Sequence, residues 1–181
     1  MKIGLISDTH GVFDPAFRQF LDPVDELWHA GDWGGDDAFV RQITEYKPVV
    51  GVYGNCDSRS LCYDFSEYQF FTRENIPILM THIGGYPGRY SPKALALIKQ
   101  LRPRLFVCGH SHILKVMYDK QFDCLTVNPG ACGIQGWHLV RTALRFDLKD
   151  GKISGMEVFE LPRASLNASS QAENLSGLKK N

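Results

Sequence analysis

The chain of 181 residues is a little longer than one typical domain, so it can bury a full hydrophobic core. An apolar fraction of 44% with a charged fraction of 22% is typical of globular proteins and excludes a mainly disordered chain. Twenty basic residues balance twenty acidic ones, so no basic excess attracts polyanions at long range. We therefore expect no dedicated nucleic-acid binding.

Cysteine usage and hydropathy favour a cytoplasmic protein. The five cysteines form no Cys-x-x-Cys pair, and their odd number suits free thiols in a reducing compartment. The apolar stretch at the N-terminus meets Asp8 too early to be the core of a signal peptide. No apolar run approaches the roughly 18 residues of a membrane span, so we expect no membrane partner.

The first third of the chain alternates strand and helix patterns. Short apolar runs that stop at polar or glycine-rich turns predict strands over Ile3–Ser7, Glu26–Ala30 and Pro48–Tyr53. Pro15–Leu21 and Asp36–Tyr46, which lie between these strands, predict short helices. Alternating strands and helices indicate that the first strands run parallel.

The rest of the chain predicts a hairpin, a helix and antiparallel strands. Ser91-Pro92 predicts a helix start, with serine as N-cap and proline at the first helical position, and the apolar spacing carries this helix to Leu101. Asp150-Gly151 is typical of a hairpin turn. The expected strands cover residues 68–72, 76–81, 105–108, 114–118, 124–127, 139–148 and 153–160.

These elements predict an α/β protein of the α+β type, with two packed mixed β-sheets flanked by helices. We expect one domain over residues 1–162 and a loose C-terminal tail, rich in serine, asparagine and lysine, over residues 163–181. In open α/β sheets, sites form where loops leave the carboxyl ends of strands. The chemistry is therefore expected directly after the predicted strands.

Oxygen and imidazole side chains follow five of these strands. Any one of them has a simpler explanation, since Asp32 could cap a helix, Asn55 could hold a turn, and a lone histidine beside a strand is usually a core residue. A whole set that converges on one sheet edge is harder to explain in this way. Carboxylates and imidazoles without thiolate suit manganese, iron, zinc or nickel. The candidate metal ligands are Asp8, His10, Asp32, Asn55, His82, His110 and His112.

The charge count favours two metal ions over one. Two divalent ions bring four positive charges, and Asp8 and Asp32 return two negative ones. The remaining positive charge favours an incoming phosphate oxygen. A clamp of two metal ions about 3.5–4 Å apart can generate hydroxide near neutral pH and stabilise both the attacking and the leaving oxygen.

The ordered series Asp8-x-His10, Gly31-Asp32, Gly54-Asn55-Cys56-Asp57, His82 and Gly109-His110-x-His112 resembles the calcineurin-like metallophosphoesterase superfamily. Within it, the short chain and the Gly-Asn-Cys-Asp motif resemble the small bacterial and archaeal phosphodiesterases of the YfcE type. The resemblance covers about residues 1–161. It implies a four-layer sandwich of two sheets and flanking helices, in agreement with the pattern above.

The resemblance also implies roles for the ligands. Asp8, His10 and His112 would hold the first ion, and Asn55, His82 and His110 the second. Asp32 would bridge both ions, and a hydroxide on the open side would attack phosphorus in line. Asp32 and Asn55 are thus the expected catalytic residues. The implied cofactors are two divalent ions, manganese first, with zinc, iron, nickel or magnesium as alternatives.

Two positions next to this motif are candidates for substrate binding. Cys56 stands where many larger relatives carry a histidine that protonates the leaving group, and a neutral thiol is a poor replacement. We infer a bias towards aryl or nucleoside phosphoesters, with simple space filling by Cys56 as the alternative. Arg59 could reach a phosphate or be a solvated surface residue. The loop 84–90 could be a substrate lid or a connector to the helix at Ser91.

The remaining histidines carry no expected ligand role. His29 lies in an apolar strand, so we expect a core residue or one that supports a ligand. His138 has no convergent partners in the sequence and is expected to be structural.

The expected function is metal-dependent hydrolysis of phosphodiesters, with monoesters as a second substrate class and a small phosphoester as the partner. A catalytically weak or inactive interaction module on the same fold is the alternative, because fold alone does not define function. The sequence does not determine whether the chain forms a homo-oligomer.

Overall fold

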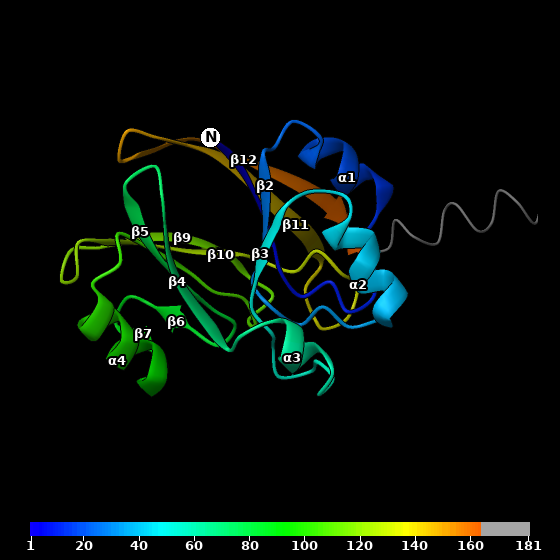
Figure 1. Cartoon of the computed structure of the whole chain (residues 1–181), viewed down its shortest axis with the longest axis horizontal. Helices are drawn as coiled ribbons and strands as arrows, with labels where there is room; N and C mark the ends of the chain where they lie inside the picture. Colours follow the sequence, from blue (N-terminus) through cyan, green and yellow to red (C-terminus); the bar gives the residue numbers. More distant parts are fainter. Residues whose placement is uncertain (164–181) are drawn as a thin grey trace, which may run out of the picture.

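The computed structural model describes residues 1–163, so the expected tail lies outside the described residues except for Arg163. Its strands form two five-stranded mixed sheets, with helices on the outer faces (Figure 1), and this confirms the predicted fold class. The first sheet has the order β12 (Lys152–Pro162), β11 (Val140–Lys149), β1 (Lys2–Ile6), β2 (Glu26–His29) and β3 (Val49–Gly51). The second has the order β4 (Tyr68–Arg73), β5 (Ile76–Thr81), β8 (Leu105–Val107), β10 (Cys124–Pro129) and β9 (Leu114–Asp119).

Parallel strands occupy the centre of both sheets. In the first sheet β1, β2 and β3 are parallel, as predicted, and β11 pairs with β1 antiparallel. In the second sheet β5, β8 and β10 are parallel, and the edge strands β4 and β9 are antiparallel to them. The predicted turn at Asp150-Gly151 joins β11 to β12, and both residues have the positive φ that a type I′ turn requires. The central parallel strands direct their carboxyl ends to shared edges.

Three apolar clusters define a four-layer arrangement. The first lies between the sheets and includes Trp28, Ile78 and Phe146. The second packs the first sheet against α1 (Pro15–Leu21) and α2 (Asp37–Thr44), and the third packs the second sheet against α4 (Pro92–Leu101). Figure 1 shows α1 and α2 on one side of the molecule and α4 on the other.

Three short elements were not predicted, and the strand expected over Pro48–Tyr53 is only three residues long. Helix α3 (Leu61–Asp64) follows the Asn55 loop, and β6 (Gly85–Tyr86) pairs with β7 (Arg89–Tyr90) in the segment expected to be a lid or a connector. β3 ends at Gly51, and the next residue, Val52, donates from its backbone N to His29 O at 3.1 Å and forms an isolated bridge to Ser66. In residues 1–163 no helix is long and apolar enough to cross a membrane.

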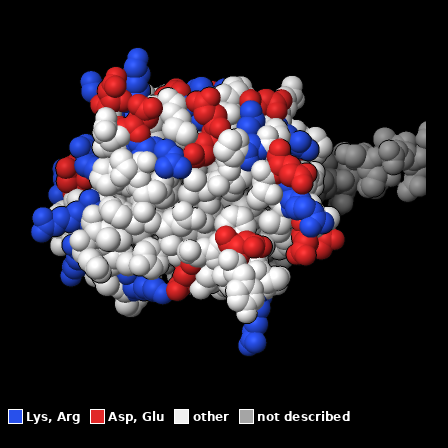
Figure 2. Space-filling view, viewed as in Figure 1, with Lys and Arg blue, Asp and Glu red and all other residues white. Residues whose placement is uncertain are grey.

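Charged side chains of both signs are interspersed around the face shown in Figure 2, and a broad area in its centre carries no charge. No large field of one sign covers this face. That arrangement agrees with the balanced composition of twenty basic and twenty acidic residues.

We expect Ser91→Ala to lower the free energy of unfolding by about 1 kcal/mol, as lost N-caps do. Ser91 Oγ accepts a hydrogen bond from Ala94 N at 3.2 Å and donates one to Ile83 O at 3.0 Å, so it ties α4 to the β6–β7 segment. Urea unfolding measures the change. Ser154→Ala, at an exposed strand position, is the control and is expected to have no effect. An unchanged midpoint for Ser91→Ala would contradict the capping role.

Candidate metal centre

Backbone hydrogen bonds bring together the loops that follow the central strands. Asp8 N donates to Gly31 O at 2.9 Å and His10 N to Asp32 O at 3.1 Å, which joins the loops after β1 and β2. In the second sheet Gly109 N donates to His82 O at 2.9 Å and joins the loops after β5 and β8. Strand order and these bonds therefore place the predicted ligands at the carboxyl ends of the central strands in each sheet.

Several candidate ligands have left-handed backbone conformations. The φ angles are +54° at Asp8, +46° at His10, +56° at Asp32, +68° at His110 and +56° at His112. Few non-glycine residues adopt such angles, which cost about 1–3 kcal/mol each and persist where the surroundings fix them. Strain of this kind clusters at functional sites. Its concentration here supports a site at the strand ends.

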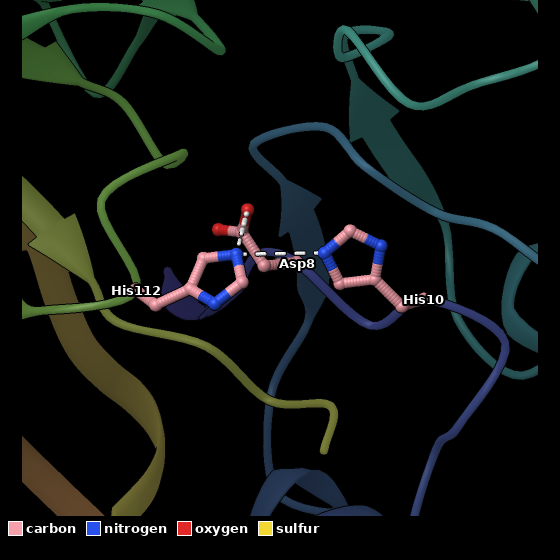
Figure 3. Close-up of side chains that lie close together, drawn as sticks. All are labelled: Asp8, His10 and His112. Atoms are coloured by element: carbon pink, nitrogen blue, oxygen red, sulfur yellow. Dashed lines mark hydrogen bonds and ion pairs between the residues drawn. The ribbon is translucent and has the colours of Figure 1, made fainter. Parts of the chain in front are cut away.

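Asp8, His10 and His112 form the first group of side chains. Figure 3 shows the three side chains directed toward one another from the loops that follow β1 and β8. His112 Nε2 lies 3.1 Å from Asp8 Oδ1 and 3.4 Å from His10 Nε2. Their ligand atoms lie within 4.8 Å of one another, a spacing that one metal ion can span. The residues expected to hold the first ion are therefore adjacent.

Asn55 and His82 form the second group with Asp32. His82 Nε2 lies 3.3 Å from Asp32 Oδ2 and 3.1 Å from Asn55 Oδ1. The other ring nitrogen, Nδ1, lies 2.8 Å from Ala30 O, so as a donor to that carbonyl it leaves Nε2 directed at the group. A second hydrogen bond of this kind orients metal-binding histidines in proteins.

Asp32 lies between the two groups. Its Oδ2 is 3.3 Å from His82 Nε2 and 3.8 Å from His10 Nε2, so one oxygen faces a histidine of each group. Its Oδ1 accepts a hydrogen bond from Cys56 N at 2.8 Å, which fixes the carboxylate plane. From this position Asp32 could contact an ion in each group, which is the role that the family resemblance implies for it.

The charged groups of the cluster shift one another's pKa values. Burial opposes ionisation of Asp32, but the hydrogen bond from His82 and its charge outweigh burial and hold the Asp32 pKa well below its usual range. Burial also lowers the His82 pKa, yet Asp32 and Asp8 raise it overall. The hydrogen bond to Asp8 raises the pKa of His112. Burial lowers the pKa of His10.

Metal binding is expected to release protons and to weaken in acid. Because the pKa values of His82 and His112 are raised in the metal-free protein, both imidazoles stay partly protonated above their ordinary pKa of about 6.5. Each must lose its proton to bind a metal ion, so affinity falls as pH drops through the raised pKa values. Calorimetry of manganese binding near pH 6.5 in buffers of different ionisation enthalpy counts the protons. Affinity that is constant between about pH 8 and 5 would contradict this.

The residues present fit divalent metal ions. Asp8 Oδ1 is buried and accepts no hydrogen bond of regular geometry within residues 1–163, although the Nε2 atoms of His112 and His82 lie 3.1 Å and 4.0 Å from it. A buried carboxylate oxygen that faces two imidazole nitrogens without a regular hydrogen bond is costly, and coordination of a cation by all three groups removes that cost. The donor set of carboxylate, amide and imidazole is the one that manganese, iron and zinc accept. Metal binding therefore explains the cluster better than a structural ion-pair network.

The structure places the other predicted site residues at or beyond the margin of the cluster. His110 is exposed, with its ring edge-on to His82 at 5.3 Å between centroids, and its backbone N donates to Asp8 Oδ2 at 3.1 Å. Its imidazole belongs to none of the close ligand groups within the described residues. Arg59 lies on an exposed turn and makes no hydrogen bond or ion pair in the described part of the chain. Its substrate role stays a prediction.

Cys56 is exposed at the margin of the cluster, and its role in substrate binding, with space filling as the alternative, stays a prediction. Its Sγ lies within 4.8 Å of ligand atoms of His10 and Asp32. Burial of the thiol and the charge of Asp32 raise its pKa, which keeps it protonated at neutral pH. A neutral thiol beside the cluster agrees with the expected preference for leaving groups that need little protonation.

Two residues that support the site were missed by sequence reasoning. Asp57, quoted only as part of a motif, accepts hydrogen bonds from Gly34 N at 3.0 Å and Gly54 N at 2.8 Å and so joins two ligand loops. His138, expected to be structural, packs edge-on against His112 with ring centroids 5.2 Å apart. The Gly54-Asn55-Cys56-Asp57 motif could have indicated that Asp57 holds the turn, because Asp57 caps Gly54 N. Nothing in the sequence near His138 indicated that its ring reaches His112.

The expectation for His29 is confirmed, because its buried ring supports the ligand loops. The ring stacks on Trp33 at 3.8 Å between centroids, and Nε2 lies 2.9 Å from Thr9 Oγ1. Gly31 N donates to Nδ1 at 3.2 Å. His29 thus holds the segment that precedes Asp32.

Three open clefts surround the cluster. One of about 410 Å³ lies beside Asn55 and His82, and another of about 410 Å³ lies beside His110. A third of about 350 Å³ is lined by His112, His138 and Trp137, among others. A substrate can therefore approach the cluster from solvent and extend to either side of it.

Two mixed sheets with an Asp/His cluster at their strand ends define the chain as a metallophosphoesterase-like protein. The chain belongs to the calcineurin-like phosphoesterase superfamily, since the model of that family's domain matches residues 1–151. This confirms the resemblance that the ordered motifs indicated.

Individual relatives are distant. MJ1162 of Methanocaldococcus jannaschii is 27% identical in an alignment of 141 positions that covers 66% of this chain and 64% of that protein, so the chain spans less than two thirds of this relative. An archaeal phosphodiesterase matches in structure with a TM-score of 0.68 and 20% identity over 89% of this chain and 100% of its own. Vps29 of Entamoeba histolytica, in complex with zinc, matches in structure with a TM-score of 0.67 and 17% identity, and the match covers 90% of this chain and 99% of the Vps29 chain. These structures share the fold.

Proposed function

We propose that the chain is a metal-dependent phosphoesterase that hydrolyses phosphodiesters, with monoesters as a second substrate class. The observation that carries the proposal is the position of Asp32 Oδ2, which faces His10 on one side and His82 on the other. A single carboxylate between two groups of ligands suits a pair of ions better than one ion. The archaeal phosphodiesterase of the same fold adds support for the diester class.

The ligands divide between two ions in this proposal. Asp32 would contact both ions, which when bound would supply hydroxide near neutral pH for in-line attack at phosphorus and would stabilise the charge that develops there. Manganese is our first expectation, with zinc, iron, nickel and magnesium as alternatives. The zinc complex of Vps29 shows that a protein of this fold binds such an ion. The first ion is held by Asp8, His10 and His112, and the second by Asn55, His82 and His110.

The neighbouring side chains orient the substrate. Asn55 is exposed and lines the cleft beside His82, so its amide can also contact the substrate phosphate. Its Nδ2 lies 3.2 Å from Cys56 Sγ, which places the thiol on the same side. Because that thiol is a weak acid, aryl and nucleoside esters are the favoured substrates.

Metal removal and restoration test the function. The metal-free protein is expected to be inert towards bis(4-nitrophenyl) phosphate, and manganese is expected to restore turnover. A panel of mono- and diesters then ranks the substrate classes. A metal-loaded protein that hydrolyses no member of the panel would overturn the proposal.

A non-catalytic interaction module is the second candidate. Trp137 is 98% exposed and Ile113 is 60% exposed, and both line the cleft beside His112. Exposed apolar side chains beside a cleft are typical of interaction surfaces. An inert panel result with intact metal binding would favour this function.

A further inference from the structure

A groove of about 410 Å³ adjoins the metal centre on the side of His110 and has no role so far. We call it the hairpin groove, because the β6–β7 hairpin forms one wall and the start of β9 forms another. Gly109, His110 and Ser111, from the loop that carries two candidate ligands, also line it. The side chains used below are Tyr86, Arg89, Ser111 and Lys115, which all line the groove.

The charge of the hairpin groove is positive. Arg89 and Lys115 line it, and its lining contains no acidic residue. Lys115 Nζ lies 3.5 Å from the centroid of the Tyr86 ring, which holds the ammonium group at the groove wall. Neither cation has a salt bridge within residues 1–163. Asp119, on the same face of β9, is occupied by hydrogen bonds from Tyr90 Oη and Gln121 N.

The groove also offers a hydroxyl donor. Ser111 Oγ accepts hydrogen bonds from Asn128 Nδ2 at 3.1 Å and from Ile113 N at 3.4 Å. Because two donors occupy its lone pairs, its own O–H is directed to another acceptor. An anion in the groove would supply that acceptor.

The wall that carries Arg89 is fixed by its surroundings. Gly85 pairs with Tyr90 in the hairpin, and Tyr90 Oη bonds to Asp119 and Thr126 on the second sheet. A Cβ at Gly84 would lie 2.4 Å from Cys108 Cβ, so the base of the hairpin packs tightly on β8. Preorganised groups bind a ligand at a lower entropic cost.

The cleft beside Asn55 and His82 differs in charge from the hairpin groove. It is lined by Tyr53, Asn55, Glu67 and Lys93, among others, and its two charged side chains form a salt bridge with each other. The opposite charges of Glu67 and Lys93 therefore cancel, and these two side chains add no net charge to the cleft. An anionic part of a substrate is therefore attracted to the hairpin groove and not to this cleft.

We propose that the hairpin groove is a subsite for a second phosphate group of the substrate, carried by the part of the molecule beyond the phosphodiester that is cleaved. Arg89, Lys115 and the Ser111 hydroxyl bind this phosphate. The inference rests on the proposed phosphodiesterase function and extends it, because it assigns the substrate class as phosphodiesters with an additional phosphate monoester.

Two matched substrates test the subsite. The 4-nitrophenyl ester of thymidine 5′-phosphate has one phosphate, and the same ester of thymidine 3′,5′-bisphosphate adds a second without changing the leaving group. In the manganese-loaded protein the 3′-phosphate is expected to raise kcat/KM about tenfold or more, because hydrogen bonds that join charged groups are stronger than those between neutral ones. Lys115→Gln and Arg89→Gln should each remove most of this gain and leave the simple ester unaffected. High salt should reduce the gain.

Lys93→Gln, in the other cleft, is the matched control and should keep the gain. An equal kcat/KM for the two esters in the wild-type protein, or a gain that survives Lys115→Gln together with Arg89→Gln, would overturn the subsite. If neither ester is hydrolysed, the proposed function fails. Calorimetry with thymidine 3′,5′-bisphosphate then decides on the subsite alone: tighter binding to wild type than to the double variant supports it, and equal binding refutes it.

Discussion

Replacing Asp32 by asparagine is expected to lower kcat/KM for an aryl phosphodiester on the order of a thousandfold. Asp32 Oδ2 faces His82 and His10, and the carboxylate is almost fully buried. Removing one preorganised electrostatic group from a catalytic site costs about 2.7–4 kcal/mol of transition-state stabilisation, and each 1.36 kcal/mol corresponds to a tenfold change in rate. Asparagine keeps the shape and accepts the hydrogen bond from Cys56 N, so the fold is expected to survive.

Kinetics, metal analysis and circular dichroism of the Asp32→Asn variant check this expectation. The variant should bind fewer than two manganese ions per chain and keep the wild-type spectrum. Asp147→Asn is the matched control, because Asp147 pairs with Lys2 at the amino end of β1, away from the ligand loops. It should keep full turnover. An Asp32→Asn variant with wild-type turnover would remove the basis of the two-metal proposal.

The layout of the site was predictable because strand ends are local features. The runs that end at Asp8, Asp32 and Asn55 are apolar and short, and each stops at a glycine or a polar residue. Parallel pairing of β1, β2 and β3 then brings those ends to one edge, whatever the loops do in detail. The position of a ligand at a strand end can therefore be predicted without knowledge of the long-range contacts.

Features that depend on tertiary contacts escaped prediction. His138 reaches His112 because the loop 130–138 returns to the strand ends, where Cys132 N donates to Ser7 O at 2.9 Å. The β6–β7 hairpin forms in the segment that was expected to be a lid or a connector, and Tyr90 anchors it to the second sheet. A contact between distant segments leaves no local signal in either segment.

The left-handed angles of the ligands also lie beyond a sequence pattern. Glycine would adopt these conformations freely, but it offers no ligand atom. Aspartate and histidine are used instead, and hydrogen bonds across the loops, such as His10 N to Asp32 O, fix the strained backbone. Part of the stabilising free energy of the fold therefore offsets the backbone strain that holds these side chains in position.

Gly54→Ala is expected to abolish most phosphodiester turnover, because it displaces the backbone of the loop that carries Asn55. A Cβ at Gly54 would lie 2.1 Å from Asp32 Oδ1 and 2.4 Å from Asp32 N, both far inside contact distance. Asp32 N is backbone and cannot rotate away, so the loop that carries Asn55 must move. Such overpacking costs about 1–3 kcal/mol of stability, and a displacement of about 1 Å at a catalytic site costs about a hundredfold in rate.

A second glycine separates loss of stability from loss of geometry. Gly151→Ala adds a Cβ with no atom within 4 Å, but at a φ of +76°, so it costs about 1 kcal/mol through backbone strain alone. We expect both variants to unfold at lower urea concentration and only Gly54→Ala to lose phosphodiester turnover and metal affinity. Equal turnover in the two variants would mean that the approach of Gly54 to Asp32 does not position the metal ligands, and that the site tolerates a displaced Asn55.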